Sequence, residues 1–121
     1  MIALLPAMPV MAQDDIGYAS ALDALAALRA MPGAGTLSLS GANNTFFLIT
    51  EPGGAVTWRF TTETDPAHPA AIRMSTETRD GQRFRLLRFR CDGAEAACAQ
   101  LIQNFTAEDA RLNPRAQRLK E

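Results

Sequence analysis

The strongest constraint on the fold is the dipeptide Asp80-Gly81, which separates two strand-like runs. Asp-Gly is typical of the two-residue turn of a tight β-hairpin, because both turn positions take positive φ angles. Apolar residues alternate in the run before it, from Ala71 to Thr78, and the return run extends from Gln82 to Cys91. These runs predict an antiparallel hairpin.

The alternation breaks in the middle of the return strand. Phe84 and Leu86 share one parity, whereas Leu87, Phe89 and Cys91 share the other. A β-bulge near Leu86-Leu87 would return all five to the core, because the extra residue reverses the facing of everything after it. The bulge would also gather four arginines on the outer face: Arg83, Arg85, Arg88 and Arg90.

Three earlier runs predict strands at Thr36–Ser40, Thr45–Thr50 and Ala55–Thr61, separated by the turn sequences Gly41–Asn44 and Pro52–Gly54. The middle run is apolar on both faces, which is typical of a central strand. The third run alternates and predicts three inward residues, namely Val56, Trp58 and Phe60. Its outward residues are then Thr57, Arg59 and Thr61.

Two helices flank these runs. Apolar spacing predicts a helix from about Ile16 to Met31, capped by Asp14 or Asp15. Its predicted inner residues are Tyr18, Leu22, Leu25 and Leu28, beside Ala21. Asp92 with Glu95 resembles a capping box and predicts a second helix with an inner face of Ala94, Cys98, Leu101 and Phe105. Thr106 with Asp109 predicts a short further helix to Leu112.

The order of these elements predicts an α+β fold: an antiparallel sheet of about five strands, a meander plus a hairpin, flanked by an N-terminal and a C-terminal helix. A chain of 121 residues, 47% hydrophobic and 21% charged, suits one globular domain. We assign this domain to residues 13–112. The polar residues 113–121 follow Pro114 and predict a mobile tail.

The first twelve residues are uncharged and almost wholly apolar. Val10 and Ala12 fit the small-residue positions of a signal-peptidase site, with cleavage before Gln13. Residues 1–12 are therefore predicted to be the remnant of a signal peptide, and the protein to be periplasmic or secreted from a bacterium. No run reaches the ~20 apolar residues of a membrane span, so no transmembrane segment is predicted.

The two cysteines are Cys91 and Cys98, with six residues between them. An isolated even pair in an exported chain predicts a disulfide, here joining the last strand to the second helix. Such a short loop contributes roughly 2–3 kcal/mol in the loop-entropy model. The redox motif Cys-x-x-Cys is absent from the sequence.

Nearly all basic residues are arginines: the chain has eleven arginines and one lysine. Arg59 and Arg73 could join the four arginines of the return strand in a basic strip, which would bind a protein or an anionic envelope component. Alternatively, the strip is a solvated face with cross-strand pairs to acids such as Glu51, Glu63 or Glu77. A net charge of −1, and the absence of aromatic residues from the predicted arginine-bearing face, argue against a nucleic-acid partner.

His68 is the single histidine and lies between Pro66 and Pro69. It could act as a general base oriented by Asp65, as a stiff recognition knob, or as a plain loop residue. No serine or threonine stands in a nucleophile-elbow context, so no catalytic residue is assigned. No metal-ligand cluster or glycine-rich phosphate loop is present, so no metal or cofactor is predicted.

The stretch from Trp58 to Ala70 resembles one found in small uncharacterised bacterial periplasmic proteins. In those proteins a W-x-F-T strand runs into a loop ending P-A-H-P-A, as Phe60 to Ala70 does here. The resemblance covers about a tenth of the chain. It implies export and a small secreted domain, it adds weight to His68 as part of a recognition loop, and it brings no catalytic residue.

These features favour a non-catalytic periplasmic binding or accessory module, such as an inhibitor or immunity-type protein, which recognises a macromolecular partner. One alternative is a small hydrolase that uses His68 as its base. Another is a carrier of a lipid or other apolar ligand between helix and sheet. The strand Thr36–Ser40, if it lies at a sheet edge, could pair with a second copy.

Overall fold

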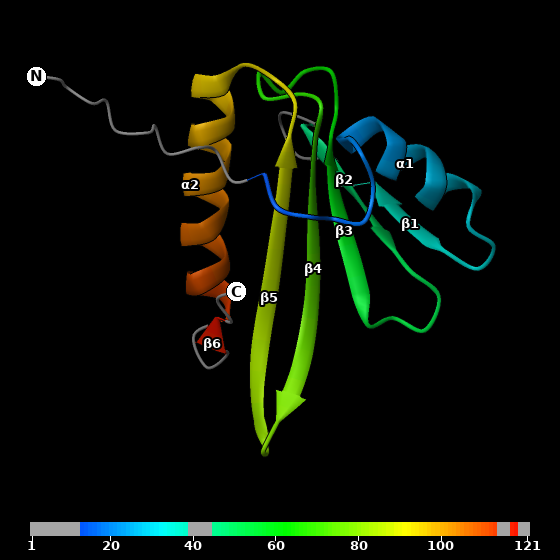
Figure 1. The fold of residues 1–121 in the computed structure, drawn as a ribbon, viewed down its shortest axis with the longest axis vertical. Coiled ribbons are helices and arrows are strands. Elements are labelled where there is room, and N and C mark those ends of the chain that lie inside the picture. The colour runs from blue at the N-terminus through cyan, green and yellow to red at the C-terminus, as the bar shows by residue number, and fades with distance from the viewer. Residues whose placement is uncertain (1–12, 39–44, 114–116, 119–121) are drawn as a thin grey trace, which may run out of the picture.

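The computed structural model describes residues 13–38, 45–113 and 117–118. The predicted signal-peptide remnant, residues 1–12, and the turn Gly41–Asn44 lie outside the described residues. The elements in chain order are α1 (Ala21–Ala30), β1 (Gly35–Ser38), β2 (Phe46–Thr50), β3 (Val56–Thr61), β4 (Ala70–Arg79), β5 (Gln82–Cys91), α2 (Glu95–Leu112) and β6 (Gln117–Arg118) (Figure 1).

The strands form one sheet in which spatial order follows chain order, from β1 to β6. Strands β1 to β5 pair antiparallel, and the two-residue β6 pairs parallel to β5 at Phe84 and Arg85. The predicted α+β class and antiparallel sheet are therefore confirmed. In the segment predicted to be a tail, Gln117–Arg118 joins the sheet. Strand β1 lies at the opposite edge, and β2 lies between two neighbours as predicted.

The β4–β5 hairpin turns at Asp80 and Gly81, whose φ angles are 52° and 82°. Its register is unbroken from Ala70↔Cys91 to Arg79↔Gln82. The predicted β-bulge is therefore wrong. Side chains alternate strictly along β5, which puts Leu86 on one face of the sheet and Leu87 on the other.

Both faces of the sheet carry a core, so apolar residues of either parity are accommodated. On one face, Trp58 and Phe60 of β3 pack with Ala24 and Leu28 of α1. On the other, Ile72 of β4 and Phe89 of β5 pack with Phe105 of α2. Since β3 residues of one parity meet α1 and those of the other meet α2, the helices cover opposite faces. The predicted outward facing of Arg59 and Thr61 is wrong for this reason.

Helix α1 begins five residues later than predicted, at Ala21. Its N-cap is Ser20, whose hydroxyl accepts a hydrogen bond from the Asp23 N–H at 3.0 Å. Upstream, Gly17 has a φ of +90°, and its N–H donates to the Asp15 carboxylate at 2.8 Å. This turn prevents a helix from starting at Ile16.

The buried face of α1 also differs from the prediction. Leu22 is 52% exposed, whereas Ala21 and Ala24 are buried beside Leu28. Small residues let the helix approach the sheet closely, so the alanine-bearing side is the one that packs.

Helix α2 is continuous, and the predicted separate helix at its end is wrong. Its N-cap is Ala94 and carries no side-chain cap, so the predicted Asp92 capping box is also wrong. Of the predicted inner residues, Cys98 and Phe105 are buried and Leu101 is half-buried. No helix in the described part of the chain is long and apolar enough to cross a membrane.

Candidate functional site

The regular register of β5 divides its four arginines between the two faces of the sheet. Arg83 and Arg85 lie on the α2 face, and Arg88 and Arg90 on the α1 face. Arg59 lies beneath α2, and Arg73 is directly opposite Arg88. The single strip predicted from the sequence is therefore wrong, because it depended on the bulge.

Arg85 and Arg90 are held in ion pairs within the chain. The Arg90 Nε donates to the Asp92 carboxylate at 2.8 Å. Arg85 donates from Nη2 and Nε to the two carboxylate oxygens of Asp109, at 2.5 and 3.3 Å. Arg83 is exposed near the hairpin turn. The positive charges of Arg85 and Arg90 are thus compensated within the chain.

Arg73 and Arg88 line a recess on the α1 face. Trp58, Arg73 and Arg88 are successive cross-strand partners in β3, β4 and β5, so they form one row across the sheet. The recess has a volume of about 400 Å³. Its other lining residues are Asp15, Ile16, Gly17, Tyr18 and Glu51.

The chain before α1 forms one wall of this recess. Asp14 anchors it to the β5 edge through two hydrogen bonds with Phe89, at 2.8 and 2.9 Å. The chain then crosses the sheet to α1, as Figure 1 shows in blue. Tyr18 packs edge-on against Trp58, with 5.9 Å between ring centroids.

The charge in the recess is unevenly compensated. Within the part of the chain that the structure describes, Arg73 makes no hydrogen bond and no ion pair. The Arg88 Nη1 donates to the main-chain carbonyl of Asp15 at 3.4 Å, and the Glu51 carboxylate accepts from Trp58 Nε1 at 2.8 Å. Like charges placed directly opposite on two strands destabilise a sheet, so an oxyanion bound between the guanidinium groups would relieve the repulsion.

A second hollow lies between α2 and the other face of the sheet, with a volume of about 360 Å³. Arg59 lies at its inner end, with Cζ 3.6 Å from the centroid of the Phe46 ring. Its Nη1 is 3.7 Å from the Glu108 carboxylate. Burial lowers the pKa of Arg59, while the charges of Glu108 and Asp65 act in the opposite direction. We call this hollow the α2 groove.

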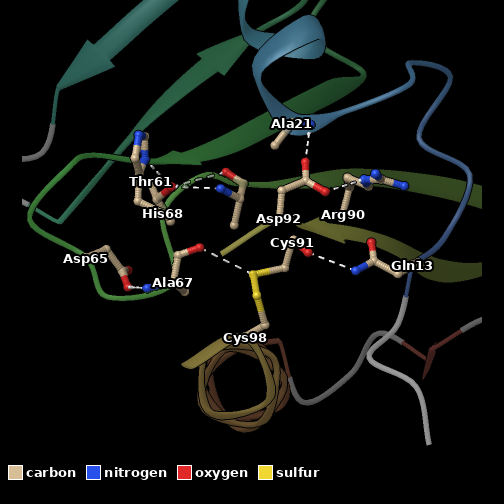
Figure 2. Close-up of a disulfide and its surroundings, with 11 residues drawn as sticks. Gln13, Ala21, Thr61, Asp65, Ala67, His68, Arg90, Cys91, Asp92 and Cys98 are labelled. Atoms are coloured by element: carbon tan, nitrogen blue, oxygen red, sulfur yellow. Dashed lines mark hydrogen bonds and ion pairs between the residues drawn. A yellow bond between two sulfur atoms is a disulfide. The ribbon is translucent and has the colours of Figure 1, made fainter. Parts of the chain in front are cut away.

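The predicted disulfide between Cys91 and Cys98 is present, with an S–S distance of 2.01 Å and a Cα–Cα distance of 5.8 Å. It joins the end of β5 to the first turn of α2, and Cys91 Sγ lies 3.4 Å from the Ala67 carbonyl oxygen (Figure 2). Both cysteines are buried with Ala67 and Ala70. The loop that carries His68 is thereby packed against the disulfide.

His68 is held in this loop by Thr61, a residue that the sequence pattern did not single out. Its Nδ1 lies 2.9 Å from the Thr61 hydroxyl, which also accepts a hydrogen bond from the Ala70 N–H at 2.9 Å. Asp65, the predicted orienting carboxylate, instead accepts from the Ala67 N–H at 2.8 Å (Figure 2). The geometry thus places a hydroxyl at His68 Nδ1.

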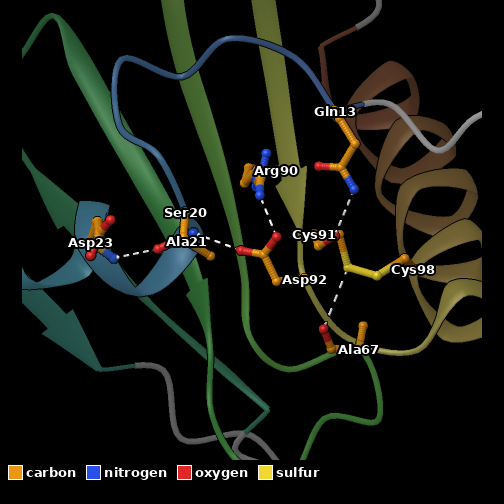
Figure 3. Close-up of polar contacts among 9 residues, drawn as sticks. All are labelled: Gln13, Ser20, Ala21, Asp23, Ala67, Arg90, Cys91, Asp92 and Cys98. Carbon is orange, nitrogen blue, oxygen red and sulfur yellow. Dashed lines mark hydrogen bonds and ion pairs between the residues drawn. A yellow bond between two sulfur atoms is a disulfide. The ribbon is translucent and has the colours of Figure 1, made fainter.

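Figure 3 shows the junction of β5 and α2, where Asp92 binds the first N–H of α1 at Ala21 as well as Arg90. Nearby, the Gln13 side-chain amide donates to the Cys91 carbonyl at 2.8 Å.

Among the described residues, no three His, Cys, Asp or Glu side chains gather as a metal site would require.

Sequence reasoning found Arg73 and Arg88 and offered Glu51 as a pairing acid, but it missed Tyr18 as their neighbour and the hydrogen bond between Glu51 and Trp58. Glu51 follows β2 and was expected at the surface. One signal could have pointed to it: an inward-facing Trp58 needs an acceptor for its indole N–H, and Glu51 is an acid in the turn just before β3.

The fold and its hollows define an α+β protein with a two-sided antiparallel sheet, one disulfide and a recess that presents a pair of arginines. No protein-family model, curated protein or solved structure matches this chain. The function is therefore inferred from the residues of the recess and the α2 groove.

Proposed function

We propose that the protein is an exported, non-catalytic binding module that recognises a carboxylate group of a protein partner in the bacterial envelope, with Arg73 and Arg88 as the binding residues. One observation carries this proposal: Arg73 faces Arg88 directly in a recess, yet makes no ion pair in the described part of the chain.

The guanidinium group suits this task because its planar fork binds a carboxylate through two parallel hydrogen bonds. The sheet fixes the backbone positions of the two arginines on adjacent antiparallel strands, and the planar fork of each guanidinium is pre-organised, so less side-chain entropy is lost per hydrogen bond formed. The recess is open enough to admit a side chain or a chain terminus, and Tyr18 and Trp58 supply an aromatic wall.

The acids at the rim favour a protein over a polyanion. Asp15 and Glu51 line the same recess as the two arginines. A densely charged polymer or an anionic lipid surface would be repelled by these carboxylates, whereas an isolated carboxylate flanked by neutral or basic residues would not. We therefore favour a protein surface that presents one isolated acidic residue.

Export is the other part of the proposal. The disulfide supports it, because such bonds persist in oxidising compartments. We expect intact-mass analysis of the natively produced protein to give a chain that starts at Gln13 and lacks the two thiol hydrogens. A chain that retains residue 1 and two free thiols would contradict export.

The binding site is tested with a pair of matched double variants. The variant Arg73→Gln/Arg88→Gln removes the recess charges, and Arg79→Gln/Arg83→Gln removes two exposed hairpin charges. We expect NMR titration with acetate to shift the amides of Arg73, Arg88 and Gly17 in the wild type and in the hairpin variant. We expect no such shifts in the recess variant.

Partner recovery is measured with the same proteins. Affinity capture from envelope extract should recover a partner with the wild type and the hairpin variant, and at least about tenfold less with the recess variant, since each charge-assisted hydrogen bond contributes roughly 1.5–3 kcal/mol. Equal recovery by all three proteins, or acetate shifts that are confined to the hairpin, would contradict the proposal.

A further inference from the structure

We infer that the α2 groove is a binding site for a single-chain amphiphile with an acidic head group, such as a fatty acid. The head group would lie at Arg59, and the chain along the apolar side chains of Phe46, Leu48, Met74 and Leu112. This site lies on the opposite face of the sheet from the Arg73–Arg88 recess and is independent of it.

The lining of the groove is apolar where the chain would lie. Phe46 and Leu48 come from β2 and Met74 from β4, and all three are only half-buried. Leu112 on α2 is 60% exposed, although it is a large apolar residue. A volume of about 360 Å³ lies within the range of small-molecule sites, about 300–1,000 Å³. An alkyl chain would cover apolar surface that is otherwise hydrated.

The charge at the inner end selects the head group. The Arg59 side chain is only 15% exposed, and its buried Nε has no hydrogen-bond partner among the described residues. Its nearest counter-charge, Glu108, is 3.7 Å away and 45% exposed. A buried cation with weak compensation is costly, so a carboxylate at the terminal nitrogens of Arg59 would stabilise it.

The other charges around the groove do not compete for the ligand. Arg85 and Asp109 neutralise each other through two hydrogen bonds. On the far side of Arg59 a separate hollow of about 350 Å³ has a mixed lining, with Asp65, Gln100 and Asn104 beside Leu101 and Phe105. We place the alkyl chain instead toward the C-terminal end of α2, where the exposed Leu112 lies.

Head-group selection is tested first on the wild type, with dodecanoate and dodecanol as probes below their micelle concentrations. In isothermal titration calorimetry we expect dodecanoate to bind at least about tenfold tighter than dodecanol, as a charge-assisted hydrogen bond gives. Glu108→Gln should tighten dodecanoate binding and leave dodecanol unchanged, because it removes the competing carboxylate. Dodecanol binding as tight as dodecanoate, or no binding of either, would overturn the inference.

The location is tested with variants on both faces. Leu112→Ser should weaken both probes about fivefold because it removes apolar contact area, and Arg59→Gln should abolish the preference for dodecanoate. The matched controls are Leu22→Ser, a comparably exposed leucine on α1, and Arg79→Gln at the exposed end of the hairpin. Should the controls weaken dodecanoate while Leu112→Ser and Glu108→Gln leave it unchanged, the ligand would lie elsewhere and the inference would fail. This comparison uses only the Leu112 and Glu108 variants and the controls, so it remains valid even if Arg59→Gln fails to fold.

Discussion

Asp92 accepts a hydrogen bond from the main-chain N–H of Ala21, with 2.8 Å between the carboxylate oxygen and the nitrogen and 71 residues between them in the chain. Ala21 is the first residue of α1, so a side chain from the β5–α2 junction satisfies one of the free N–H groups at the start of the helix. The same carboxylate binds Arg90. Asp92 thereby links the start of α1 to the end of β5, just before α2 begins.

Replacing Asp92 should loosen the start of α1. We expect Asp92→Ala to lower the free energy of unfolding by about 1–2 kcal/mol, the usual cost of a lost cap, and Asp92→Asn to cost less because its amide oxygen can still accept. Urea unfolding measures the stability, and amide hydrogen exchange at Ala21 measures the local effect. Unchanged exchange at Ala21 in Asp92→Ala would contradict the role of the cap.

Gly93 should tolerate no side chain. A Cβ at this position would lie 2.3 Å from the Ala67 carbonyl oxygen and 2.9 Å from that of His68, and both atoms belong to the backbone. We expect Gly93→Ala to destabilise the protein by about 2 kcal/mol or more, as overpacking does.

The control for Gly93 is Gly35→Ala in β1. An added Cβ there meets nothing within 4 Å, and the glycine has no positive φ. Thermal unfolding of both variants separates the steric clash from the general effect of replacing glycine. Similar melting temperatures for the two would mean that the junction can shift away from the Ala67 carbonyl.

Removing one member of the Arg85–Asp109 pair should lower the free energy of unfolding strongly, whereas replacing both members by apolar residues should lower it little. Asp109 is 5% exposed, and Asp109→Ala would leave the half-buried charge of Arg85 without this partner. We expect a loss of about 3–5 kcal/mol in urea unfolding, whereas the double variant Arg85→Met/Asp109→Leu should recover most of it. The exposed pair Arg79–Glu77 is the matched control, where Glu77→Ala should cost less than about 1 kcal/mol.

Reduction of the disulfide should destabilise the attachment of α2 to the sheet. By the loop-entropy model, Cys91→Ser/Cys98→Ser is expected to cost roughly 2–3 kcal/mol. Added loss of packing is also expected, because both sulfurs are buried. Urea unfolding with and without reductant should reproduce this difference in the wild type and show none in the double variant. A reductant effect that persists without the cysteines would contradict the assignment.

Local signals predicted the strands and the hairpin well. The boundaries of β5 are the predicted ones, because strand periodicity and the Asp80-Gly81 turn act within a few residues. The disulfide could be predicted for the same reason, since the cysteine spacing fits a strand end followed by a helix.

The arrangement of the arginines could not be predicted in this way. If a helix covers only one face of the sheet, burying both Leu86 and Leu87 requires a bulge. If helices cover both faces, regular pairing buries one leucine on each face. The bulge would have placed Arg85 and Arg88 on one face, whereas regular pairing separates them. Only the positions of α1 and α2 decide between these possibilities, and they depend on contacts distant in sequence.

The amino-acid sequence by itself determined strands β1 to β5, the hairpin turn and the cysteine pairing, because these depend on neighbouring residues and on short loops. The tertiary structure decided which faces are covered, and with them the Arg73–Arg88 recess, the α2 groove and the Asp92 cap on α1. Each of these joins groups from separate elements, so its energy depends on how the sheet and helices pack and leaves no periodic signal in the chain.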